Sequence, residues 1–237
     1  MVQGKVVYIT GGSKGIGYGI AANLMAQGAT VYLTARSQQG VDEAISALGK
    51  SDHGIAKGLV CDVRSLDDQT AVVDQIIADE GRLDIVVANA GVGHFQPIDE
   101  MSVGQWHEMI DINLTGVFNT VKASVEALKK SKGYIITIAS LAGTNFFAKG
   151  SGYNASKFGL VGFTQSVMLD LRQYGIKVTT IMPGSVSTYF NNRTPTESEG
   201  WKIQSEDIGQ IVSDLLHMHP RTLPSKIEVR PSQPPSK

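Results

Sequence analysis

A tyrosine and a lysine stand four residues apart in the segment GSGYNASKFG, residues 150–159. Residues four apart share one face of an α-helix, so the phenol of Tyr153 and the ammonium of Lys157 can point at the same spot. A free phenol, with a pKa near ~10, is poorly matched to neutral pH, and a neighbouring cation lowers that pKa by stabilising the phenolate. Such a pair could exchange a proton with a substrate oxygen. Taken alone, the decapeptide is more typical of a solvated helix face, so the rest of the chain must decide.

A glycine-rich segment, TGGSKGIG at residues 10–17, is the second chemical signal. Glycines let a backbone turn tightly and approach a pyrophosphate, and the free N–H groups at a helix start favour its negative charge. Gly11, Gly15 and Gly17 have the spacing GxxxGxG, and the strict fingerprint GxGxxG is absent because Ile20 occupies its last position. The segment predicts a dinucleotide site, with a plain tight turn as the alternative.

The choice of dinucleotide depends on the end of the next strand-like run, VYLTARSQ. Enzymes that prefer NAD usually place an acidic residue here to bind the ribose hydroxyls, but the candidate positions hold Ala35 and Arg36. Arg36 can bind a 2′-phosphate through charge-assisted hydrogen bonds, and Lys14 can add a second cation. One such bond is worth ~1.5 to 3 kcal/mol, about tenfold to a hundredfold in affinity. The sequence therefore predicts NADP (NADPH) in preference to NAD, unless Arg36 is an ordinary solvated arginine.

These residues need a scaffold, and the hydrophobic pattern supplies one. Short β-branched runs predict strands at 5–10, 30–36, 55–60, 83–89, 134–139, 177–182 and 226–230. Helical periodicity predicts helices at 15–27, 41–48, 66–80, 103–130, 153–174 and 206–217, with N-caps at Ser65 and Ser102 and stops at Gly28, Gly81 and Gly175. Strict alternation of strand and helix indicates parallel pairing with right-handed crossovers.

The fold expected from this pattern is α/β, a single-domain Rossmann-like doubly wound parallel sheet of about seven strands with helices on both faces. The apolar runs VVYI, DIVVA and YIITIA alternate little, as strands covered on both faces do. The domain should span residues 1–230, with 185–204 as a polar, mobile substrate-side loop and 231–237 as a disordered tail. In such a sheet, ligands bind beyond the carboxyl ends of the strands.

Composition narrows the classes of partner. The 237 residues are 42% hydrophobic and 18% charged, with a formal net charge of -1, so a nucleic-acid or anionic-membrane surface is not expected. No run approaches the ~20 apolar residues of a membrane span. Cys61 is the single cysteine, which fits a reduced, cytoplasmic setting. His217 and His219 lack the companions of a metal site, so no metal is expected.

Further motifs stand at the predicted strand ends: CDV at 61–63, ANAG at 88–91, IAS at 138–140 and PG at 183–184. Together with TGGSKGIG and YNASK, in this order and at these distances, they make the chain resemble the classical short-chain dehydrogenase/reductase family over about residues 4–190. The resemblance implies a catalytic tetrad of Asn113, Ser140, Tyr153 and Lys157, in which Asn113 holds a water that connects the lysine to solvent.

The glycine turn and the resemblance together imply a set of residues that contact the cofactor. Within it, Asp62 and Val63 would border the adenine, and the PGSVST segment would bind the nicotinamide amide. The full set is Gly11, Ser13, Lys14, Gly15, Ile16, Gly17, Arg36, Asp62, Val63, Asn89, Ala90, Gly91, Tyr153, Lys157, Pro183, Gly184, Val186 and Thr188.

The function expected is an NADP(H)-dependent oxidoreductase that reduces a ketone or aldehyde to an alcohol, or runs the reverse. The cofactor supplies a hydride, Tyr153 the proton, and Ser140 a hydrogen bond to the substrate oxygen. One alternative is a 3-oxoacyl-[acyl carrier protein] reductase. An alternative of another class is a non-catalytic NADP-binding sensor or scaffold, although a scaffold has no need of a proton donor.

Substrate-side features leave more than one interpretation open. His94 would overhang the cleft and could touch substrate, or be an exposed loop histidine. Phe146 and Phe147 could form an apolar wall, pack under their loop or lie at a subunit contact. A homodimer or homotetramer is expected, but the proline-containing end SKIEVRPSQPP departs from the glycine-rich end of many family members. That departure weakens both the tetramer and a role in fatty-acid synthesis.

Overall fold

The apolar, β-branched runs of the chain form one parallel sheet. The computed structural model describes residues 2–233, apart from the side chain of Asn192, and contains seven strands: β1 (Val6–Ile9), β2 (Thr30–Ala35), β3 (Ile55–Val60), β4 (Ile85–Ala88), β5 (Tyr134–Ile138), β6 (Lys177–Pro183) and β7 (Lys226–Val229). Their order is β3-β2-β1-β4-β5-β6-β7, and every neighbouring pair is parallel. The order reverses between β1 and β4, the point at which such sheets bind ligands.

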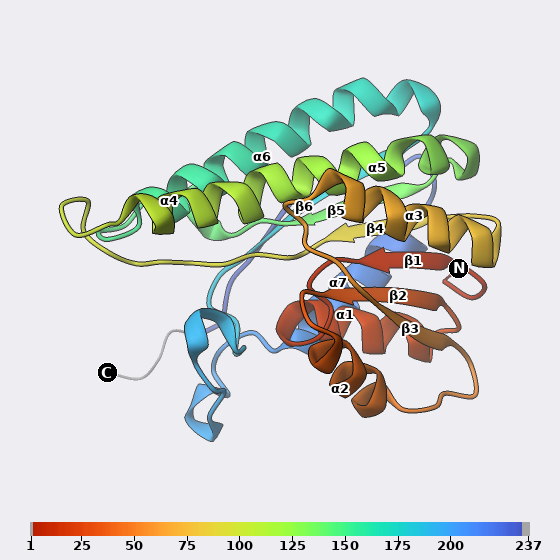
Figure 1. Ribbon diagram of the computed structural model, residues 1–237, viewed down its shortest axis with the longest axis horizontal. Coiled ribbons are helices and arrows are strands. Elements are labelled where there is room, and N and C mark those ends of the chain that lie inside the picture. Colours follow the sequence, from red (N-terminus) through yellow and green to blue (C-terminus); the bar gives the residue numbers. More distant parts are fainter. Residues whose placement is uncertain (1, 234–237) are drawn as a thin grey trace.

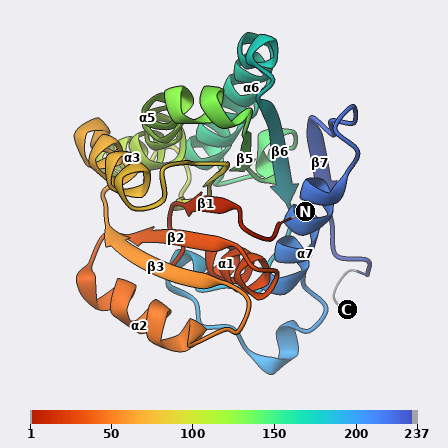
Figure 2. The ribbon, with the colours of Figure 1, turned by 90° about the vertical axis from the view of Figure 1, so that its right-hand side faces the viewer.

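Helices cover both faces of the sheet (Figures 1 and 2). One layer holds α1 (Gly15–Ala26), α2 (Gln38–Leu48) and α7 (Ser205–His217), and the other holds α3 (Leu66–Glu80), α5 (Gly116–Ser131) and α6 (Ser151–Leu171). The short α4 (Val103–Ile110) precedes α5. The doubly wound fold expected from the alternation of strands and helices is thus confirmed.

The central strands are buried on both sides, as their unbroken apolar runs predict. In β1, Val7 and Ile9 face the α1–α7 layer, while Val6 and Tyr8 face the α3–α5–α6 layer, and each is at most 4% exposed. Each large apolar side chain contributes roughly 1.5 to 3 kcal/mol when it is fully buried. The two resulting cores hold the strand ends in fixed positions.

The expected helix caps are present. The Ser65 hydroxyl accepts from the Asp68 N–H at 3.1 Å, and the Ser102 hydroxyl accepts from the Gln105 N–H at 3.1 Å. Gly81 and Gly175 end their helices in the left-handed region, with φ of 71° and 76°. These local signals are legible from sequence because side chain and backbone lie within a few residues of each other.

The helix expected as one element over 103–130 departs from that expectation. A π-helical segment, Asp111–Thr115, separates α4 from α5, and the Gly116 N–H bonds back to the Asp111 carbonyl, five residues earlier. Such bulges rotate the following side chains relative to a regular helix and occur often at functional sites. Here the bulge contains Asn113, which is fully buried.

The substrate-side loop at 185–204 and the disordered tail at 231–237 remain predictions. Residues 234–237 of the expected disordered tail lie outside the described residues, and 231–233 form no helix or strand. The loop 185–204 contains two short 3₁₀ turns, Phe190–Asn192 and Glu197–Glu199, so it is less irregular than its composition suggests. Between residues 2 and 233, no helix has the length and apolarity that a membrane span requires.

A buried carboxylate braces the edge of the sheet opposite the cleft. Asp84 is 3% exposed and accepts from Lys5 Nζ at 3.0 Å, the Val6 N–H at 3.0 Å and Arg82 Nε at 2.9 Å. Burial alone would raise the pKa of Asp84, but the hydrogen bonds from Arg82, Val6 and Lys5 outweigh it and hold the pKa below its usual value. The carboxylate therefore contributes stability only while it is ionised.

We expect Asp84→Ala to lower the free energy of unfolding by about 1 to 3 kcal/mol at pH 7, because the Val6 N–H loses its acceptor. The folded state binds the proton of Asp84 less readily than the unfolded chain does. The stabilisation is therefore present above the unfolded pKa of ~3.9 and is lost as the pH falls through the lower, folded value. Urea titrations from pH 7 to pH 3 should show the two proteins converging in acid. A constant difference over that range would contradict this role.

Candidate active site

A cleft of about 1680 Å³ opens beyond the carboxyl ends of the strands. It collects most of the residues singled out from the sequence, although they come from elements far apart in the chain. Those that line it are Gly11, Ser13, Lys14, Gly15, Ile16, Arg36, Asp62, Val63, Asn89, Ala90, Gly91, Ser140, Tyr153, Lys157, Pro183, Gly184, Val186 and Thr188. Gly17 and Asn113 do not line it; both are buried behind its wall.

The glycine turn has room for a ligand because its positions exclude side chains. Gly11 has φ +62°, and a Cβ there would lie 2.9 Å from the Cα of Ala90. Gly15 has φ +60°, also in the region that side chains rarely adopt. Asn89 fastens the turn from β4, donating from Nδ2 to the carbonyls of Thr10 at 2.9 Å and Gly11 at 3.0 Å. Asn89 thus holds the turn's shape as well as lining the cleft.

The helix that follows the turn begins without a side-chain cap. Lys14 occupies the N-cap position of α1 and makes no side-chain capping hydrogen bond. The first N–H groups of a helix need acceptors from outside it, and with the helix dipole they favour an anion. Gly15 leaves the approach open; a Cβ there would lie 3.3 Å from Thr188 Cβ across the cleft. The turn therefore fits a dinucleotide pyrophosphate.

The far end of the cleft brings two cations, Lys14 and Arg36, together with two carboxylates. Arg36 is exposed directly after β2 and lines the cleft with Lys14 and with Ser37, the N-cap of α2. The nearby carboxylate of Asp62 accepts two hydrogen bonds from Arg64 Nε, at 3.0 and 2.9 Å, and these hydrogen bonds are the largest influence that lowers the pKa of Asp62. Glu43 of α2 also lines this end, with its carboxylate accepting from Gln39 at 2.8 Å.

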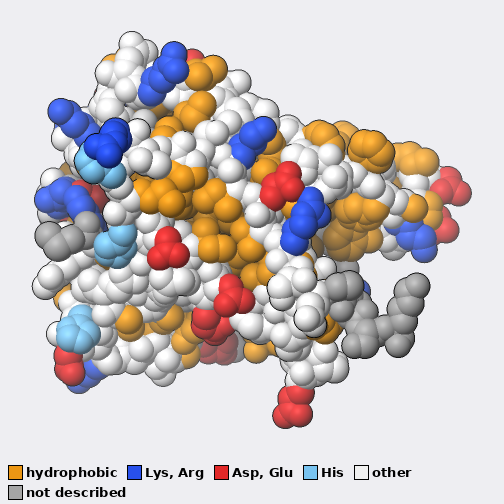
Figure 3. Space-filling model, turned by 180° about the vertical axis from the view of Figure 1, so that it is seen from behind, with side chains coloured by type: hydrophobic (Ala, Val, Ile, Leu, Met, Phe, Trp, Pro, Cys, Tyr) orange, Lys and Arg blue, Asp and Glu red, His pale blue; other side chains and the backbone are white. Residues whose placement is uncertain are grey.

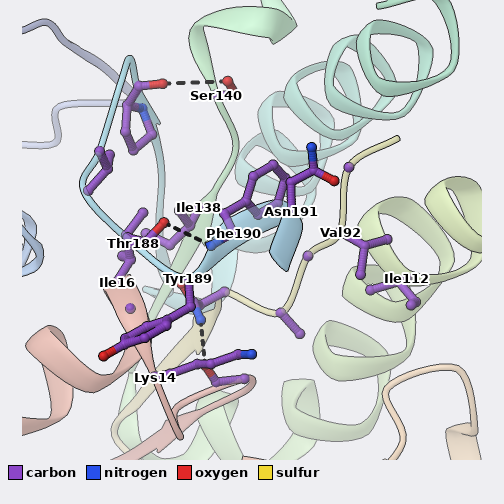
Figure 4. Close-up of a pocket in the computed structure, with 18 of the residues that line it drawn as sticks. Lys14, Ile16, Val92, Ile112, Ile138, Ser140, Thr188, Tyr189, Phe190 and Asn191 are labelled. Carbon is purple, nitrogen blue, oxygen red and sulfur yellow. Dashed lines mark hydrogen bonds between the residues drawn. The ribbon is translucent and has the colours of Figure 1, made fainter. Parts of the chain in front are cut away.

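Tyr153 and Lys157 lie together in the floor of the cleft, on the helix face that their spacing predicts. Lys157 Nζ lies 5.8 Å from the centre of the Tyr153 ring and donates to the Ile138 carbonyl at 3.1 Å. Both side chains are almost fully buried, with 9% and 4% of their surface exposed. Ser140, directly after β5, donates weakly to the Pro183 carbonyl at 3.5 Å (Figure 4).

The proton affinities of this pair differ from the expectation that the ammonium lowers the pKa of the phenol. Burial raises the pKa of Tyr153 to about 12, although a hydrogen bond with Ser140 acts in the opposite direction. Burial also lowers the pKa of Lys157 to about 8. The expected direction for the pKa of Tyr153 is wrong in this structure, because loss of water outweighs the opposing hydrogen bond with Ser140. The phenol of Tyr153 is consequently protonated throughout the neutral range.

Asn113 lies behind Tyr153 and Lys157, and its side chain is hydrogen-bonded to Val92 and Ser156. Its Oδ1 accepts from the Val92 N–H at 2.8 Å, and its Nδ2 donates to the Val92 carbonyl at 2.9 Å and to the Ser156 hydroxyl at 3.0 Å. Ser156 in turn donates to the Tyr153 carbonyl at 2.8 Å. The side chain of Asn113 thus ties the segment after β4 to the helix that carries Tyr153 and Lys157.

Aromatic side chains around Tyr153 were not all singled out from the sequence. Phe95 packs edge-on against the Tyr153 ring at 5.3 Å, and Phe190 packs against the same ring at 5.8 Å. Phe190 comes from the segment that also carries Thr188 and Tyr189 (Figure 4). Phe95 stands four residues after Gly91, a position on the strand exit that could have drawn attention. Phe190 sits in a polar segment and gave no periodic signal.

Phe146 and Phe147, whose roles the sequence leaves open, differ in their positions. Phe147 lines the cleft, with its ring centre 5.9 Å from that of Phe95, whereas Phe146 is 85% exposed and does not line it. His94, which the sequence leaves as either a substrate contact or an exposed loop residue, lines the cleft. Its Nε2 pairs with Glu108 at 2.7 Å. His217 bonds to the Ser213 carbonyl at 2.8 Å, and residues 2–233 contain no cluster suited to a metal ion.

Asn154, between Tyr153 and Lys157, fixes the segment that carries Ser140. Its Nδ2 donates to the carbonyls of Ala142 and Asn145, each at 2.7 Å, and the residue is 8% exposed. These bonds tie the turn after β5 to the start of α6. The sequence reasoning missed this residue, since an asparagine inside a helix carries no distinctive signal.

We expect Asn154→Ala to lower kcat by roughly tenfold to a hundredfold, because small displacements of a catalytic group carry penalties of that size. The dissociation constant of the cofactor should stay within about threefold, since the glycine turn is untouched. Steady-state kinetics and a cofactor titration measure the two effects separately. An unchanged kcat would show that the turn after β5 holds its position without Asn154.

Known proteins are similar to this chain over most of its length, including the residues that line the cleft. A family model described as short chain dehydrogenase matches residues 5–199. The 3-oxoacyl-[acyl-carrier-protein] reductase of Salmonella typhimurium is 37% identical over 187 residues, which cover 78% of this chain and 75% of the reductase. A solved alcohol dehydrogenase from the archaeon Thermococcus sibiricus, complexed with 5-hydroxy-NADP, has a TM-score of 0.91 at 28% identity and covers 99% of this chain and 100% of its own. A metagenomic short-chain oxidoreductase in complex with NADP has a TM-score of 0.84 at 34% identity, over 98% of this chain and 99% of its own.

Proposed function

The chain belongs to the short-chain dehydrogenase family, and on that premise we propose that it is an NADP(H)-dependent reductase of a ketone or aldehyde, or the corresponding alcohol dehydrogenase. One observation carries the proposal. The buried pair of Tyr153 and Lys157 lies in the same cleft as the uncapped start of α1. A proton donor and a pyrophosphate cradle in one cleft suit a hydride-transfer reaction better than either feature alone.

The roles proposed for the chain's own residues follow from their contacts. A nicotinamide dinucleotide, when bound, supplies the hydride that the carbonyl carbon accepts. Tyr153 donates its phenolic proton to the carbonyl oxygen, and the Ser140 hydroxyl orients that oxygen by a hydrogen bond. Lys157 supplies positive charge beside the phenolate left behind. Its low pKa of about 8 also makes it a suitable group for returning the proton near neutral pH.

Asn113 is proposed to act together with Ser140, Tyr153 and Lys157, through its main-chain groups and not through its side chain. Its side chain is occupied by Val92 and Ser156, so a water that leads to Lys157 would have to be held by main-chain groups of the π-helical segment. A Cβ added to Gly91 would lie 3.3 Å from Asn113 Oδ1 and 3.6 Å from Lys157 Nζ, so Gly91 keeps the space between the two open. This arrangement supports the proposal that proton supply passes behind Tyr153.

The preference for NADP rests on Arg36, Lys14 and the start of α2. We expect Arg36→Asp to reverse the preference, because a carboxylate repels a 2′-phosphate and binds ribose hydroxyls instead. The ratio of kcat/KM for NADPH to that for NADH should fall by about tenfold to a hundredfold or more. Arg172→Asp, a charge reversal at an exposed residue outside the cleft, serves as the control. Equal use of both cofactors by the wild-type protein would defeat the charge argument.

Two other functions stay under consideration. The Salmonella relative supports a 3-oxoacyl-[acyl-carrier-protein] reductase, and an NADP-binding sensor or scaffold needs only the glycine turn. A panel of ketones, aldehydes and an acetoacetyl thioester of acyl carrier protein, assayed with NADPH and NADH, separates the three. Turnover of free carbonyls supports the leading proposal, turnover confined to the thioester supports the second, and cofactor binding without any turnover supports the scaffold.

The proposed assembly is a homodimer or homotetramer of a single domain spanning residues 1–230, with 185–204 as the substrate-side loop. Seen from behind, hydrophobic side chains gather in the middle of the face and toward its upper right (Figure 3). Helices α5 and α6 also carry exposed hydrophobic side chains, among them Phe118, Phe158 and Leu169. A second copy of the chain is the proposed cover for these helices, and the mass in solution decides between the two assemblies.

A further inference from the structure

Four aromatic rings that line the cleft pack against one another around Tyr153. We call this cluster the aromatic box and define it by Phe95, Phe147, Tyr153 and Phe190. Phe95 contacts the other three rings, at 5.9 Å from Phe147, 5.3 Å from Tyr153 and 6.4 Å from Phe190. The ring centres of Tyr153 and Phe190 are also close, at 5.8 Å. The rings are tilted or edge-on, the geometries that aromatic pairs prefer.

Glycines seat the rings and their apolar neighbours. A Cβ on Gly93 would lie 2.6 Å from Cζ of Phe190, and a Cβ on Gly150 would lie 2.7 Å from Cε2 of Phe147. A Cβ on Gly152 would lie 2.3 Å from Cε of Met109, which is fully buried beside Tyr153. Each contact is closer than a real Cβ allows. The box is therefore a close-packed apolar wall and not an accidental gap between loops.

Apart from Lys157, whose Nζ lies 5.8 Å from the centre of the Tyr153 ring, the charged groups near the box are paired or exposed. His94 and Glu108 are bonded to each other at 2.7 Å, and Lys202 pairs with Glu199 in the loop. Arg193, which also lines the cleft, is exposed on the rim, where a charge contributes little to binding. The hydroxyl of Tyr153, with Ser140 beside it, supplies the polarity within the box. That distribution suits a substrate whose single polar group is the carbonyl.

One ring of the box comes from the substrate-side loop. Phe190 belongs to the loop 185–204, whose two ends are joined by the bridge between Val186 and Ile203 and by the bond from the Ser187 N–H to the Ile203 carbonyl at 2.9 Å. Phe95, Phe147 and Tyr153 lie on other segments. The contacts of Phe190 with Tyr153 and Phe95 are thus the ones that the loop contributes to the box.

Resting on the proposed function, we propose that the substrate is a ketone or aldehyde whose carbonyl carbon carries an aromatic ring. Such a ring takes over the tilted ring contacts that Phe190 makes with Phe95 and Tyr153, with Phe95 as its main partner. A saturated ring or an acyl chain buries similar area but cannot restore those contacts. The reaction itself is unchanged: the carbonyl carbon gains a hydride, its oxygen gains the Tyr153 proton, and no further reactant is needed.

The test compares two ketones of matched shape, acetophenone and cyclohexyl methyl ketone, with NADPH or NADH. Conjugation makes acetophenone the less reactive of the two toward hydride, so a preference for it must come from the protein. We expect kcat/KM to favour acetophenone by at least about fivefold. Phe95→Leu should reduce the preference about two- to tenfold, the range for one aromatic pair. Phe146→Leu, a substitution in the adjacent exposed ring outside the cleft, should leave it unchanged.

A binding measurement separates this inference from the proposed function. Benzamide and cyclohexanecarboxamide are unreactive analogues, and calorimetry should give tighter binding of benzamide in the wild type and a reduced difference in Phe95→Leu. If no carbonyl is turned over but this binding pattern holds, the proposed reaction fails and the aromatic box stands. Equal kcat/KM for the two ketones, a preference unaffected by Phe95→Leu, or a much better aliphatic oxo acid or acyl-carrier-protein thioester would overturn the inference.

Discussion

Tyr153→Phe is expected to lower kcat/KM for carbonyl reduction by about a hundredfold to ten-thousandfold, the range assigned to a positioned general acid. Only the hydroxyl is lost, because phenylalanine keeps the ring contacts with Phe95 at 5.3 Å and Phe190 at 5.8 Å. With a pKa raised by burial to about 12, the phenol is almost wholly protonated at neutral pH in the wild type. The loss should therefore appear at every pH between 6 and 9.

The cofactor site gives this variant an internal control. The glycine turn lies on other elements, so the dissociation constant for NADPH should change by less than about threefold. Tyr174→Phe removes a hydroxyl from a half-exposed ring in the 3₁₀ turn Arg172–Tyr174 that follows α6, outside the cleft, and should leave all kinetic constants unchanged. Retention of more than a tenth of wild-type kcat/KM in Tyr153→Phe would show that another group donates the proton.

The fold was largely predictable from the sequence because its signals are local and repeated. The run at 55–60 predicts β3 to the residue, and the caps at Ser65 and Ser102 act through bonds to the third residue after them. The strand order then follows from parallel pairing and handed crossovers. The π-helical segment around Asn113 was not predictable, since it depends on contacts with Val92 and Ser156 that form only in the folded protein.

The gathering of most of the candidate residues in one cleft was predictable from the sequence, but the environment of their side chains was not. Spacing indicates that Tyr153 and Lys157 share a helix face, but not how little water reaches them. Phe95 and Phe190 come from segments nearly one hundred residues apart, and their packing on Tyr153 contributes to its burial. That burial reversed the expected direction of the phenol's pKa. A perturbed pKa is a property of the assembled cleft, which the sequence motif alone cannot supply.

Lys157 should therefore reduce the stability of the protein while serving its reaction. Burial lowers its pKa from the usual 10.5 to about 8, so the unfolded chain holds this proton more tightly than the folded one. The penalty is fully present below pH 8 and is relieved as the pH rises from 8 to 10.5. At ~1.4 kcal/mol for each pKa unit, it amounts to roughly 3 kcal/mol.

We expect Lys157→Met to abolish carbonyl reduction and yet to raise the free energy of unfolding at pH 7 by about 1 to 3 kcal/mol. The gain is smaller than the full penalty because the Ile138 carbonyl loses the hydrogen bond from Nζ, worth about 1 kcal/mol. Urea titrations without cofactor should show the advantage shrinking between pH 8 and 10.5, as the wild-type lysine loses its proton, while Lys122→Met, at an exposed site on α5, changes nothing. In the wild type, kcat/KM for reduction should fall as the pH rises past about 8, because the free enzyme then loses the ammonium beside Tyr153. If Lys157→Met is less stable than wild type at pH 7, Lys157 is held by interactions stronger than its hydrogen bond to the Ile138 carbonyl. In that case the explanation of its lowered pKa by burial is wrong.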